Sequence, residues 1–299
     1  MHAGLDLGII PPVLTRRPGA HADWERDAGI EEVRRIAEAA ERLGYDFVSC
    51  CEHVAVPRVR DDVGGVRPGE TYWDPLPVFG HLAAHTSRIH FATLVLVVPH
   101  HHPLDIAKQY GTLDRICDGR LVLGLGVGYS EPEFELLGTP FDDRGQRADD
   151  VIRALRASFG RVDPVYHGRF FDFEDFVIDP CGIQQDVPIW IGGMSRRSLR
   201  RAVELGDAWS PFAVSTDNVK RWVHAASETE AWHRRTNPLT LVLTPDEPID
   251  PLGARAETLA IAHALQDAGA SKLTLRFAHD SLEHYLEQLE AMADVVLDL

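Results

Sequence analysis

Apolar residues recur along this chain with two alternating spacings. Short β-rich runs are each followed by a longer stretch in which apolar positions fall on one face of a helix. In the first pair, residues 5–10 form the β-rich run, and Ile30, Val33 and Ala37 share a face of the expected helix 30–43. The chain therefore begins with an expected strand followed by an expected amphipathic helix.

The same alternation repeats eight times. The expected strands cover residues 5–10, 45–50, 89–98, 121–127, 188–191, 208–210, 239–243 and 273–277. The expected helices cover residues 30–43, 74–85, 103–117, 147–159, 195–205, 216–235, 254–268 and 281–296. Such alternation implies parallel strands joined by crossover helices, and eight units in 299 residues favour closure. The sequence predicts an α/β fold, a single (β/α)8 TIM-barrel domain over 1–299, with insertions after strand four and after helix four.

Composition and charge narrow the class of protein. Hydrophobic residues make up 44% and charged residues 25%, as in globular chains with a core. Acidic residues outnumber basic ones by 46 to 30, a formal charge of −16, which argues against nucleic acid and anionic membranes as partners. An anionic ligand must then be met by a local basic patch. The chain has four cysteines but no CxxC pair, and it has no apolar run of membrane length. We therefore expect a reduced, cytoplasmic protein.

Three glycines alternate along the fourth expected strand. Gly124, Gly126 and Gly128 share one face, because side chains alternate across a strand. This face is a flat strip of backbone on which a planar ring could lie, and close packing of a helix is the alternative. The dinucleotide-binding pattern GxGxxG is absent, since Tyr129 or Glu131 stands where the last glycine would be.

The fifth expected strand ends in a candidate anion site. Residues 192–195 read Gly-Gly-Met-Ser, and glycines before a serine N-cap expose backbone N–H groups at a helix start. The first turns of that helix contain Arg196, Arg197, Arg200 and Arg201, where positive charge opposes the helix dipole. A bound anion would account for these arginines, and a solvated basic face balanced by neighbouring acids is the alternative.

Glu52 and His53 close the second expected strand. A histidine at a strand end can donate, accept or shuttle a proton near neutral pH. The alternative is a structural histidine that anchors the following loop. Glu52 could orient the His53 ring or face the next helix instead.

A run of three histidines raises the possibility of a metal site. Residues 100–102 are all histidine, with His53 and Asp280 as possible further ligands. However, a helix is expected to begin at Pro103, and strands five to seven end without metal-binding side chains. We therefore expect no metal.

Several motifs, in order along residues 1–235, resemble the luciferase-like oxidoreductase superfamily. The motifs are Pro103-Leu104-Asp105-Ile106-Ala107-Lys108-Gln109, Leu113-Asp114, Asp118-Gly119-Arg120-Leu121, Gly124-Leu125-Gly126-Val127-Gly128, Glu133-Phe134, Leu137-Gly138, Phe141, Arg144-Gly145, Arg147, Tyr166-His167-Gly168, Pro188-Ile189-Trp190-Ile191-Gly192-Gly193 and Gly206-Asp207-Ala208-Trp209. The resemblance implies a TIM-barrel enzyme that uses FMN or the deazaflavin coenzyme F420. The spacing is most similar to the actinobacterial branch of F420-dependent enzymes.

Carried over residue by residue, the resemblance implies a cofactor site. The implied phosphate contacts are Gly192, Gly193, Met194 and Ser195, with Arg196 and Arg197 next to them. The residues implied to flank the cofactor are Gly126, Val127, Gly128 and Tyr129. Thr93 and Leu94 would form a bulge under the ring, which in F420-using relatives contains a non-prolyl cis peptide. His53 and Glu52 are the expected catalytic residues from their place at the end of the second expected strand, not from the resemblance.

One departure from the family pattern bears on the substrate. Sugar-phosphate dehydrogenases of this family carry a catalytic glutamate where this chain has Tyr129, and a tryptophan where it has Pro57. Glucose-6-phosphate oxidation is therefore not expected, although Glu131 or Trp73 could replace the missing groups. The segments 57–72 and 129–145 are expected to cover the mouth of the barrel.

The leading hypothesis is hydride transfer between F420 and a small organic substrate. A monooxygenase that uses reduced FMN is the second hypothesis, and a barrel that binds the cofactor without catalysis is the third. The resemblance also implies a homodimer. Substrate identity and reaction direction do not follow from the sequence.

Overall fold

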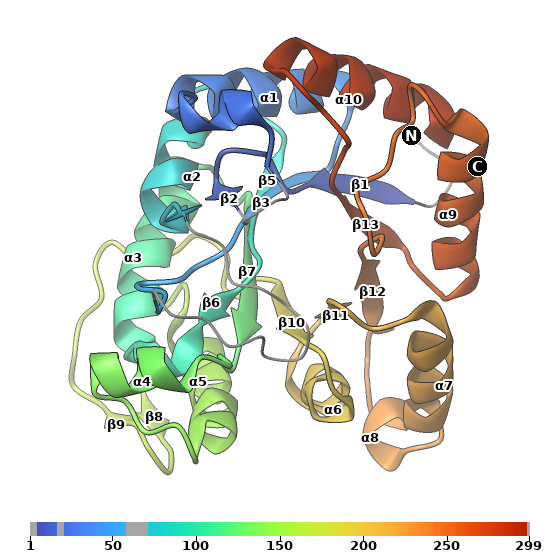
Figure 1. Ribbon diagram of the computed structural model, residues 1–299. Helices are drawn as coiled ribbons and strands as arrows, with labels where there is room; N and C mark the ends of the chain where they lie inside the picture. The colour runs from blue at the N-terminus through green and yellow to red at the C-terminus, as the bar shows by residue number, and fades with distance from the viewer. Residues whose placement is uncertain (1–4, 17–20, 58–70, 298–299) are drawn as a thin grey trace.

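Eight parallel strands close into a barrel at the centre of the protein (Figure 1). The computed structural model describes residues 5–16, 21–57 and 71–297. The eight strands are β1 (Asp6–Ile9), β3 (Phe47–Cys50), β5 (His90–Thr93), β7 (Leu121–Gly126), β10 (Ile189–Gly193), β11 (Ala208–Pro211), β12 (Thr240–Leu243) and β13 (Lys272–Leu275). Strand β10 pairs with both β7 and β11, and β1 pairs with both β13 and β3, so the sheet closes on itself. The predicted TIM-barrel fold is confirmed.

Helices form an outer ring around these strands (Figure 1). They are α1 (Ile30–Leu43), α2 (Pro75–Ala83), α3 (Pro103–Ile116), α5 (Arg144–Ser158), α6 (Arg196–Leu205), α7 (Thr216–Ser227), α9 (Arg255–Asp267) and α10 (Leu282–Val296). Asp74 begins α2 as expected, since its carboxylate accepts a hydrogen bond from Leu76 N at 2.8 Å. In the described part of the chain, no helix is both long enough and apolar enough to cross a membrane.

Both predicted insertions are present, with more local structure than the sequence indicated. The first contains a short helix, α4 (Glu131–Leu137), and the second contains the hairpin strands β8 (Tyr166–His167) and β9 (Asp172–Phe173). The single helix expected over 216–235 is wrong: the chain breaks after α7, and Thr229 caps a separate α8 (Glu230–His233). Smaller elements are β2 (Thr15–Arg16), β4 (Thr71–Tyr72), β6 (Leu96–Val97), η1 (Asp23–Arg26) and η2 (Val98–His100).

Side chains of the strands alternate between the barrel interior and the surrounding helices. Phe47, Trp190 and Val242 belong to one buried cluster inside the barrel, whereas Leu241 and Leu243 pack outward. The Phe47 and Trp190 rings meet edge to face, with centroids 5.0 Å apart. Side chains two positions beyond this interior cluster, toward the C-terminal end of each strand, also point inward. They form the floor of the C-terminal opening of the barrel, which we call the barrel mouth.

Charged residues close the opposite, N-terminal end of the barrel. Lys272 Nζ lies 2.6 Å from both Asp6 Oδ2 and Asp46 Oδ2, and His90 Nδ1 lies 3.5 Å from Asp46 Oδ1. Burial acts to raise the pKa of Asp46, but the contacts with His90 and Lys272 outweigh it and lower that pKa to about 2. This end of a TIM barrel is where stabilising interactions are expected.

We expect this cluster to make stability depend on pH in the acid range. A carboxyl with a lowered pKa stabilises the fold above its unfolded pKa of about 3.9, and this contribution is lost as the pH falls through the folded value. The free energy of unfolding should therefore differ most between wild type and Asp46→Asn above pH of about 4. The difference should shrink toward pH of about 2.

Urea unfolding at a series of pH values measures this difference. Asp23→Asn is the matched control, because the Asp23 side chain is 98% exposed. A difference that stays constant between neutral and acid pH would contradict the predicted role of Asp46.

Candidate active site

The third barrel strand is interrupted at the barrel mouth. Strand β5 ends at Thr93, the peptide bond between Leu94 and Val95 is cis, and β6 then resumes the pairing with β7. Residues 94–95, which we call the bulge, are partly exposed. The resemblance placed the bulge, with its non-prolyl cis peptide, at Thr93 and Leu94. The structure contains such a peptide one residue later, between Leu94 and Val95, because Thr93 still belongs to β5.

Glu52 fastens the bulge and does not orient His53. Its backbone N–H donates to Val95 O at 3.1 Å, and its Oε2 accepts from Val97 N at 2.7 Å. Its Oε1 lies 2.7 Å from His101 Nε2. Burial acts to lower the pKa of His101, but the hydrogen bond with Glu52 outweighs it and the pKa is raised. Of the two orientations left open for Glu52, the one toward His53 is wrong.

The bulge also covers the glycine strip. A Cβ at Gly124 would lie 1.8 Å from Thr93 O, and a Cβ at Gly126 would lie 2.4 Å from Val95 Cγ2. On the neighbouring strand, a Cβ at Gly192 would lie 2.5 Å from Val95 Cγ1. The strip is therefore filled by the chain itself, and neither a ring nor a helix lies directly on Gly124 and Gly126. The glycines instead make room for the bulge.

The residues expected to contact a cofactor divide by exposure. Those buried in the strand wall are Thr93, Gly126 and Gly192. Those with partial exposure at the barrel mouth are Leu94, Val127, Gly128, Tyr129, Gly193 and Met194. The second group lies at the ends of β5, β7 and β10, and its contact with a cofactor stays a prediction.

His53 forms a buried pair with a carboxylate from the first insertion. Its Nδ1 lies 2.8 Å from Glu133 Oε2, and the side chains are only 10% and 2% exposed. The backbone N–H groups of Val54 and Ala55 donate to Glu133 Oε1 at 2.9 and 3.2 Å. Burial acts to raise the pKa of Glu133, but the hydrogen bonds from His53, Ala55 and Val54 outweigh it and the pKa is lowered. Glu133 is therefore an ionised carboxylate that accepts the His53 Nδ1–H.

This pairing determines which ring nitrogen of His53 is available. With Nδ1–H bound to Glu133, a neutral His53 presents a bare Nε2. Tyr129 Oη lies 3.5 Å from that Nε2, and the Tyr72 ring packs against the imidazole with centroids 4.5 Å apart. The arrangement can accept a proton at Nε2 and return it, which is the chemistry of a general base and acid.

Glu133 is the functional residue that sequence reasoning missed. The residues weighed as replacements for the absent family glutamate were Glu131 and Trp73, and Glu131 is exposed in the structure. The available signal was Glu133 itself, which stands in the family motif Glu133-Phe134. Its contact emerges only from the fold, because α4 in the first insertion brings Glu133 against His53.

The start of α6 has the geometry of an anion site. Gly193 has a φ of 133°, and a Cβ there would lie 2.8 Å from Ser198 Cβ. Ser195 is the exposed N-cap, and its Oγ accepts from Ser198 N at 3.4 Å. The N–H groups of Arg196 and Arg197 open the helix and have no acceptor within it. We call this helix start the anion niche.

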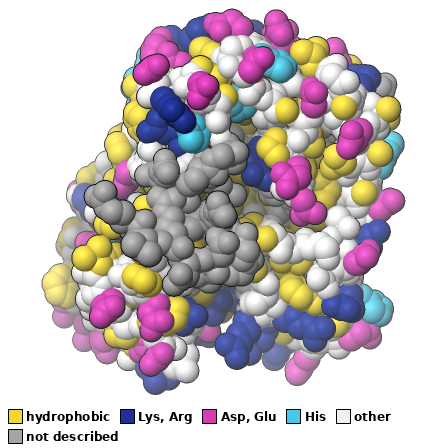
Figure 2. Space-filling view, in the orientation of Figure 1, with side chains coloured by type: hydrophobic (Ala, Val, Ile, Leu, Met, Phe, Trp, Pro, Cys, Tyr) yellow, Lys and Arg dark blue, Asp and Glu magenta, His cyan; other side chains and the backbone are white. Residues whose placement is uncertain are grey.

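Three of the four arginines near the anion niche lie on the surface. Figure 2 shows Lys and Arg side chains gathered at the lower edge of the view, over α6 and α7. Arg196, Arg197 and Arg200 are exposed, and Arg197 makes no ion pair with any residue that the structure describes. Arg201 is different: it is 8% exposed, is paired with Asp149, and donates to Gly145 O at 3.0 Å. A ligand-binding role for Arg201 is therefore wrong, since it joins α6 to α5.

The histidine run serves the packing of the barrel rim. His101 is held by Glu52, and His100 Nδ1 lies 3.1 Å from Thr139 Oγ1. His102 Nδ1 accepts from Leu104 N at 3.2 Å and so caps α3. Within the described ranges, no three His, Cys, Asp or Glu side chains form a group that could hold a metal ion.

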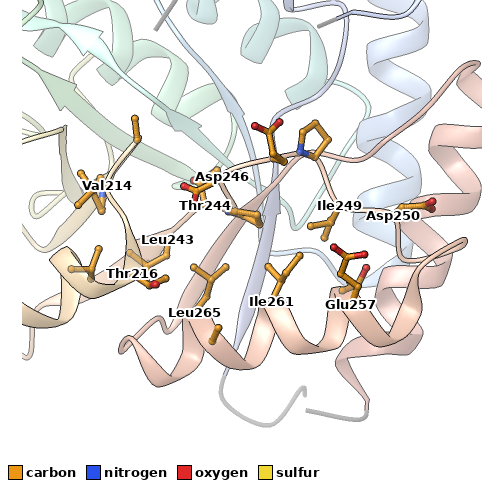
Figure 3. A pocket seen from close by; sticks show the side chains of 18 of the residues that line it. Val214, Thr216, Leu243, Thr244, Asp246, Ile249, Asp250, Glu257, Ile261 and Leu265 are labelled. Carbon is orange, nitrogen blue, oxygen red and sulfur yellow. The ribbon is translucent and has the colours of Figure 1, made fainter. Parts of the chain in front are cut away.

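A cavity lies beside the ends of β11 and β12 (Figure 3). It has a volume of about 450 Å³ and lies between α7 and α9, with Val214, Leu243, Ile261 and Leu265 among its lining. Its lining also includes Thr244 and Asp246, which follow β12. Residues 58–70, which we expected over the mouth, lie outside the described residues.

Comparison with known proteins gives a consistent family match. A family model described as luciferase-like monooxygenase matches residues 13–297. An uncharacterized protein of Mycobacterium tuberculosis is 28% identical over 214 residues, which cover 69% of this chain and 74% of that protein. The FMNH(2)-dependent dimethylsulfone monooxygenase of Pseudomonas putida is 27% identical over 198 residues, which cover 65% of this chain and 52% of that protein. The coenzyme F420 dependent tetrahydromethanopterin reductase of Methanopyrus kandleri has the same fold, with a TM-score of 0.73, 14% identity and 99% coverage of both chains.

Proposed function

Because the chain belongs to the luciferase-like monooxygenase family, we propose that it transfers a hydride between coenzyme F420 and a small organic substrate. The observation that carries the choice of F420 is the exposed arginine group Arg196, Arg197 and Arg200 beside the anion niche. In a chain of formal charge −16, local positive charge at this place favours an anionic ligand. F420 carries an acidic oligoglutamate tail, which FMN lacks.

The residues present fit a phosphorylated cofactor. The backbone at Gly193 leaves no room for a side chain, and the helix start beyond it offers N–H donors to a phosphate. Residues 192–195 would hold that phosphate, and the bulge with Val127, Gly128 and Tyr129 would border the ring. When bound, F420 supplies or accepts a hydride.

The protein would supply the matching proton transfer. Oxidation of an alcohol releases a hydride and a hydroxyl proton, and the bare Nε2 of His53 can accept that proton. In the reverse direction, the protonated ring returns it to the carbonyl oxygen. Glu133 would keep Nδ1 protonated throughout, because its carboxylate accepts that N–H at 2.8 Å. Water would be kept from the site by Tyr72 and Tyr129, which enclose the imidazole.

Equilibrium binding of F420 with different tail lengths, compared with FMN, tests the choice of cofactor. We expect F420 to bind more tightly than FMN, with an affinity that rises with the number of glutamates and falls with added NaCl. Arg197→Gln should weaken the binding of long-tailed F420 several-fold, and that of the form with one glutamate much less. Arg35→Gln on α1 is the matched control for lost charge. Tighter binding of FMN at every tail length would overturn the proposal.

The second candidate is a monooxygenase that uses reduced FMN and molecular oxygen. The observation that favours it is the 27% identity to a protein named as an FMNH(2)-dependent dimethylsulfone monooxygenase. The same anion niche would hold the FMN phosphate. Consumption of oxygen with reduced FMN, measured at an oxygen electrode, would distinguish this function from hydride transfer.

A further inference from the structure

The cavity between α7 and α9 has no part in the function proposed above. Its volume of about 450 Å³ falls within the range of small-molecule sites, roughly 300–1,000 Å³. Among the described residues that line it, none belongs to the anion niche, to the bulge or to the pair of His53 and Glu133. We call it the side cavity.

One end of the side cavity is apolar. Ile261 and Leu265 lie about one helical turn apart on α9, so their side chains share a face. Figure 3 shows both side chains extending from α9 toward the end of β12. Leu243 of β12 and Val219 of α7 also line the cavity, and both are buried. A ligand at this end would therefore meet hydrocarbon.

The other end of the side cavity carries negative charge. Four carboxylates from the loop after β12 and from the first turn of α9 line it: Asp246, Glu247, Asp250 and Glu257. Hydrogen bonds from Gln288 Nε2 at 2.7 Å and from Gly253 N at 2.8 Å lower the pKa of Asp250. No Lys, Arg or His is among the described lining residues. Arg276, which is not a lining residue, donates to Asp246 O at 2.9 Å and offsets only part of this charge. A cation would stabilise these like charges.

A buried hydroxyl lies at the same end as the carboxylates. Thr258 follows Glu257 on α9 and lines the side cavity. It is only 1% exposed, and its hydroxyl makes no hydrogen bond with any residue that the structure describes. Buried hydroxyls are normally hydrogen bonded, so this oxygen is open to an N–H donor of a ligand.

The two ends lie along one face of α9. Glu257, Ile261 and Leu265 follow one another at intervals of four residues, which places Glu257 and Leu265 about 12 Å apart along the helix. In Figure 3, Glu257 lies at one side of the side cavity and Leu243 at the other. The polar and apolar ends are therefore separated by the length of a small molecule.

We propose that the side cavity binds an organic ammonium compound with an elongated apolar body. The ammonium group lies among the four carboxylates, where the Thr258 hydroxyl accepts one of its N–H groups. The hydrocarbon lies between α7 and α9, along Ile261 and Leu265. This site goes beyond the proposed function and does not depend on which cofactor the barrel mouth holds.

Calorimetric titration of the full-length protein with three probes tests the proposal. The probes are 4-phenylbutylamine, 4-phenylbutan-1-ol and 4-phenylbutanoate, which share one apolar body and are positive, neutral and negative at neutral pH. We expect the amine to bind at least about fivefold more tightly than the alcohol, and the carboxylate to bind most weakly. The preference for the amine should shrink with added NaCl, because salt screens exposed charges.

Charge variants identify the groups that select the cation. The double variant Glu247→Gln and Glu257→Gln should bind the amine and the alcohol with nearly equal affinity. The matched control is the double variant Glu287→Gln and Glu290→Gln, because both residues are exposed on α10 and neither lines the side cavity. The control should keep the preference of the wild type.

A cavity-filling variant locates the apolar body. Ala264 lines the side cavity from α9 and is exposed, so Ala264→Phe should fill the space without disturbing the core. We expect this variant to weaken the binding of the amine by about tenfold or more. Ala260→Phe is the matched control, because Ala260 is exposed on the same helix but does not line the side cavity.

Two results would overturn the proposal. The first is equal affinity of the wild type for the amine and the alcohol, or no binding of any probe, and it requires no variant. The second is unchanged binding of the amine in Ala264→Phe, which would place the ligand elsewhere. Failure of the wild type to bind F420, with the preference for the amine intact, would instead overturn the proposed function alone.

Discussion

We expect His53→Ala to lower kcat by about 10²- to 10⁴-fold, the usual contribution of a general acid or base. The affinity for F420 should stay within a few-fold of wild type, because the backbone of the anion niche is not touched by this change. The reason is the geometry of the buried pair, in which Glu133 holds Nδ1 and leaves Nε2 for the substrate. To measure kcat, ketones and enones are first screened for one that oxidises reduced F420 in the presence of the wild-type enzyme. The rate of that oxidation is then compared between the wild type and the variant.

Glu133→Gln separates positioning from proton transfer. Glutamine keeps the size of Glu133 but removes the charge that stabilises a protonated His53, so kcat should fall less than in His53→Ala. The pH dependence of kcat should also shift, because the protonated imidazole loses its carboxylate partner.

One result would contradict the role predicted for His53. Normal single-turnover chemistry in His53→Ala, together with lost F420 affinity, would show that His53 anchors the cofactor or the loop.

The second large effect is expected at the anion niche. Ser195→Asp should weaken the binding of a phosphorylated cofactor by more than about tenfold, because it places a negative charge beside the phosphate. Aspartate is as good an N-cap as serine, so α6 should still form. Gly193 is a poorer choice, since its φ of 133° and the nearby Ser198 Cβ would strain any side chain.

Ser195→Asn is the matched control for Ser195→Asp. Asparagine also caps helices well and has nearly the same shape as aspartate, but it carries no charge. Cofactor affinity in this variant should therefore stay close to that of wild type. Equal affinity of the Asp and Asn variants, both folded by circular dichroism, would show that the phosphate binds elsewhere.

The regular part of the barrel could be predicted because its signal is local. The helix expected over 30–43 is α1 (Ile30–Leu43), and the serine expected as an N-cap at 195 begins α6. Periodicity, caps and glycine positions all act within a few residues of one another. For the same reason, the start of α6 and the glycines before it could be predicted from the chain.

The contacts that complete the candidate site could not be read in this way. His53 and Glu133 are 80 positions apart, and their contact depends on where the fold places α4. The sequence left two explanations for the glycine strip, a planar ring or a packed helix. The structure shows a third, because Val95 fills the space beside Gly126. Arg201 is indistinguishable from Arg200 in the sequence, yet it is buried and paired with Asp149. In each case a side chain from a distant segment decides the role.

The tryptophans behind the anion niche give the protein an internal optical reporter. Trp209 is fully buried, and its Nε1 donates to Ser198 Oγ at 3.1 Å. Ser198 lies in the first turn of α6, so a charge that arrives at the niche is one hydrogen bond away from an indole. Trp222 lies beneath the Arg196 guanidinium, 5.8 Å from its ring centroid. Because indole emission responds to nearby charge, occupancy of the niche can be followed by intrinsic fluorescence in unlabelled protein, even with ligands that are themselves colourless.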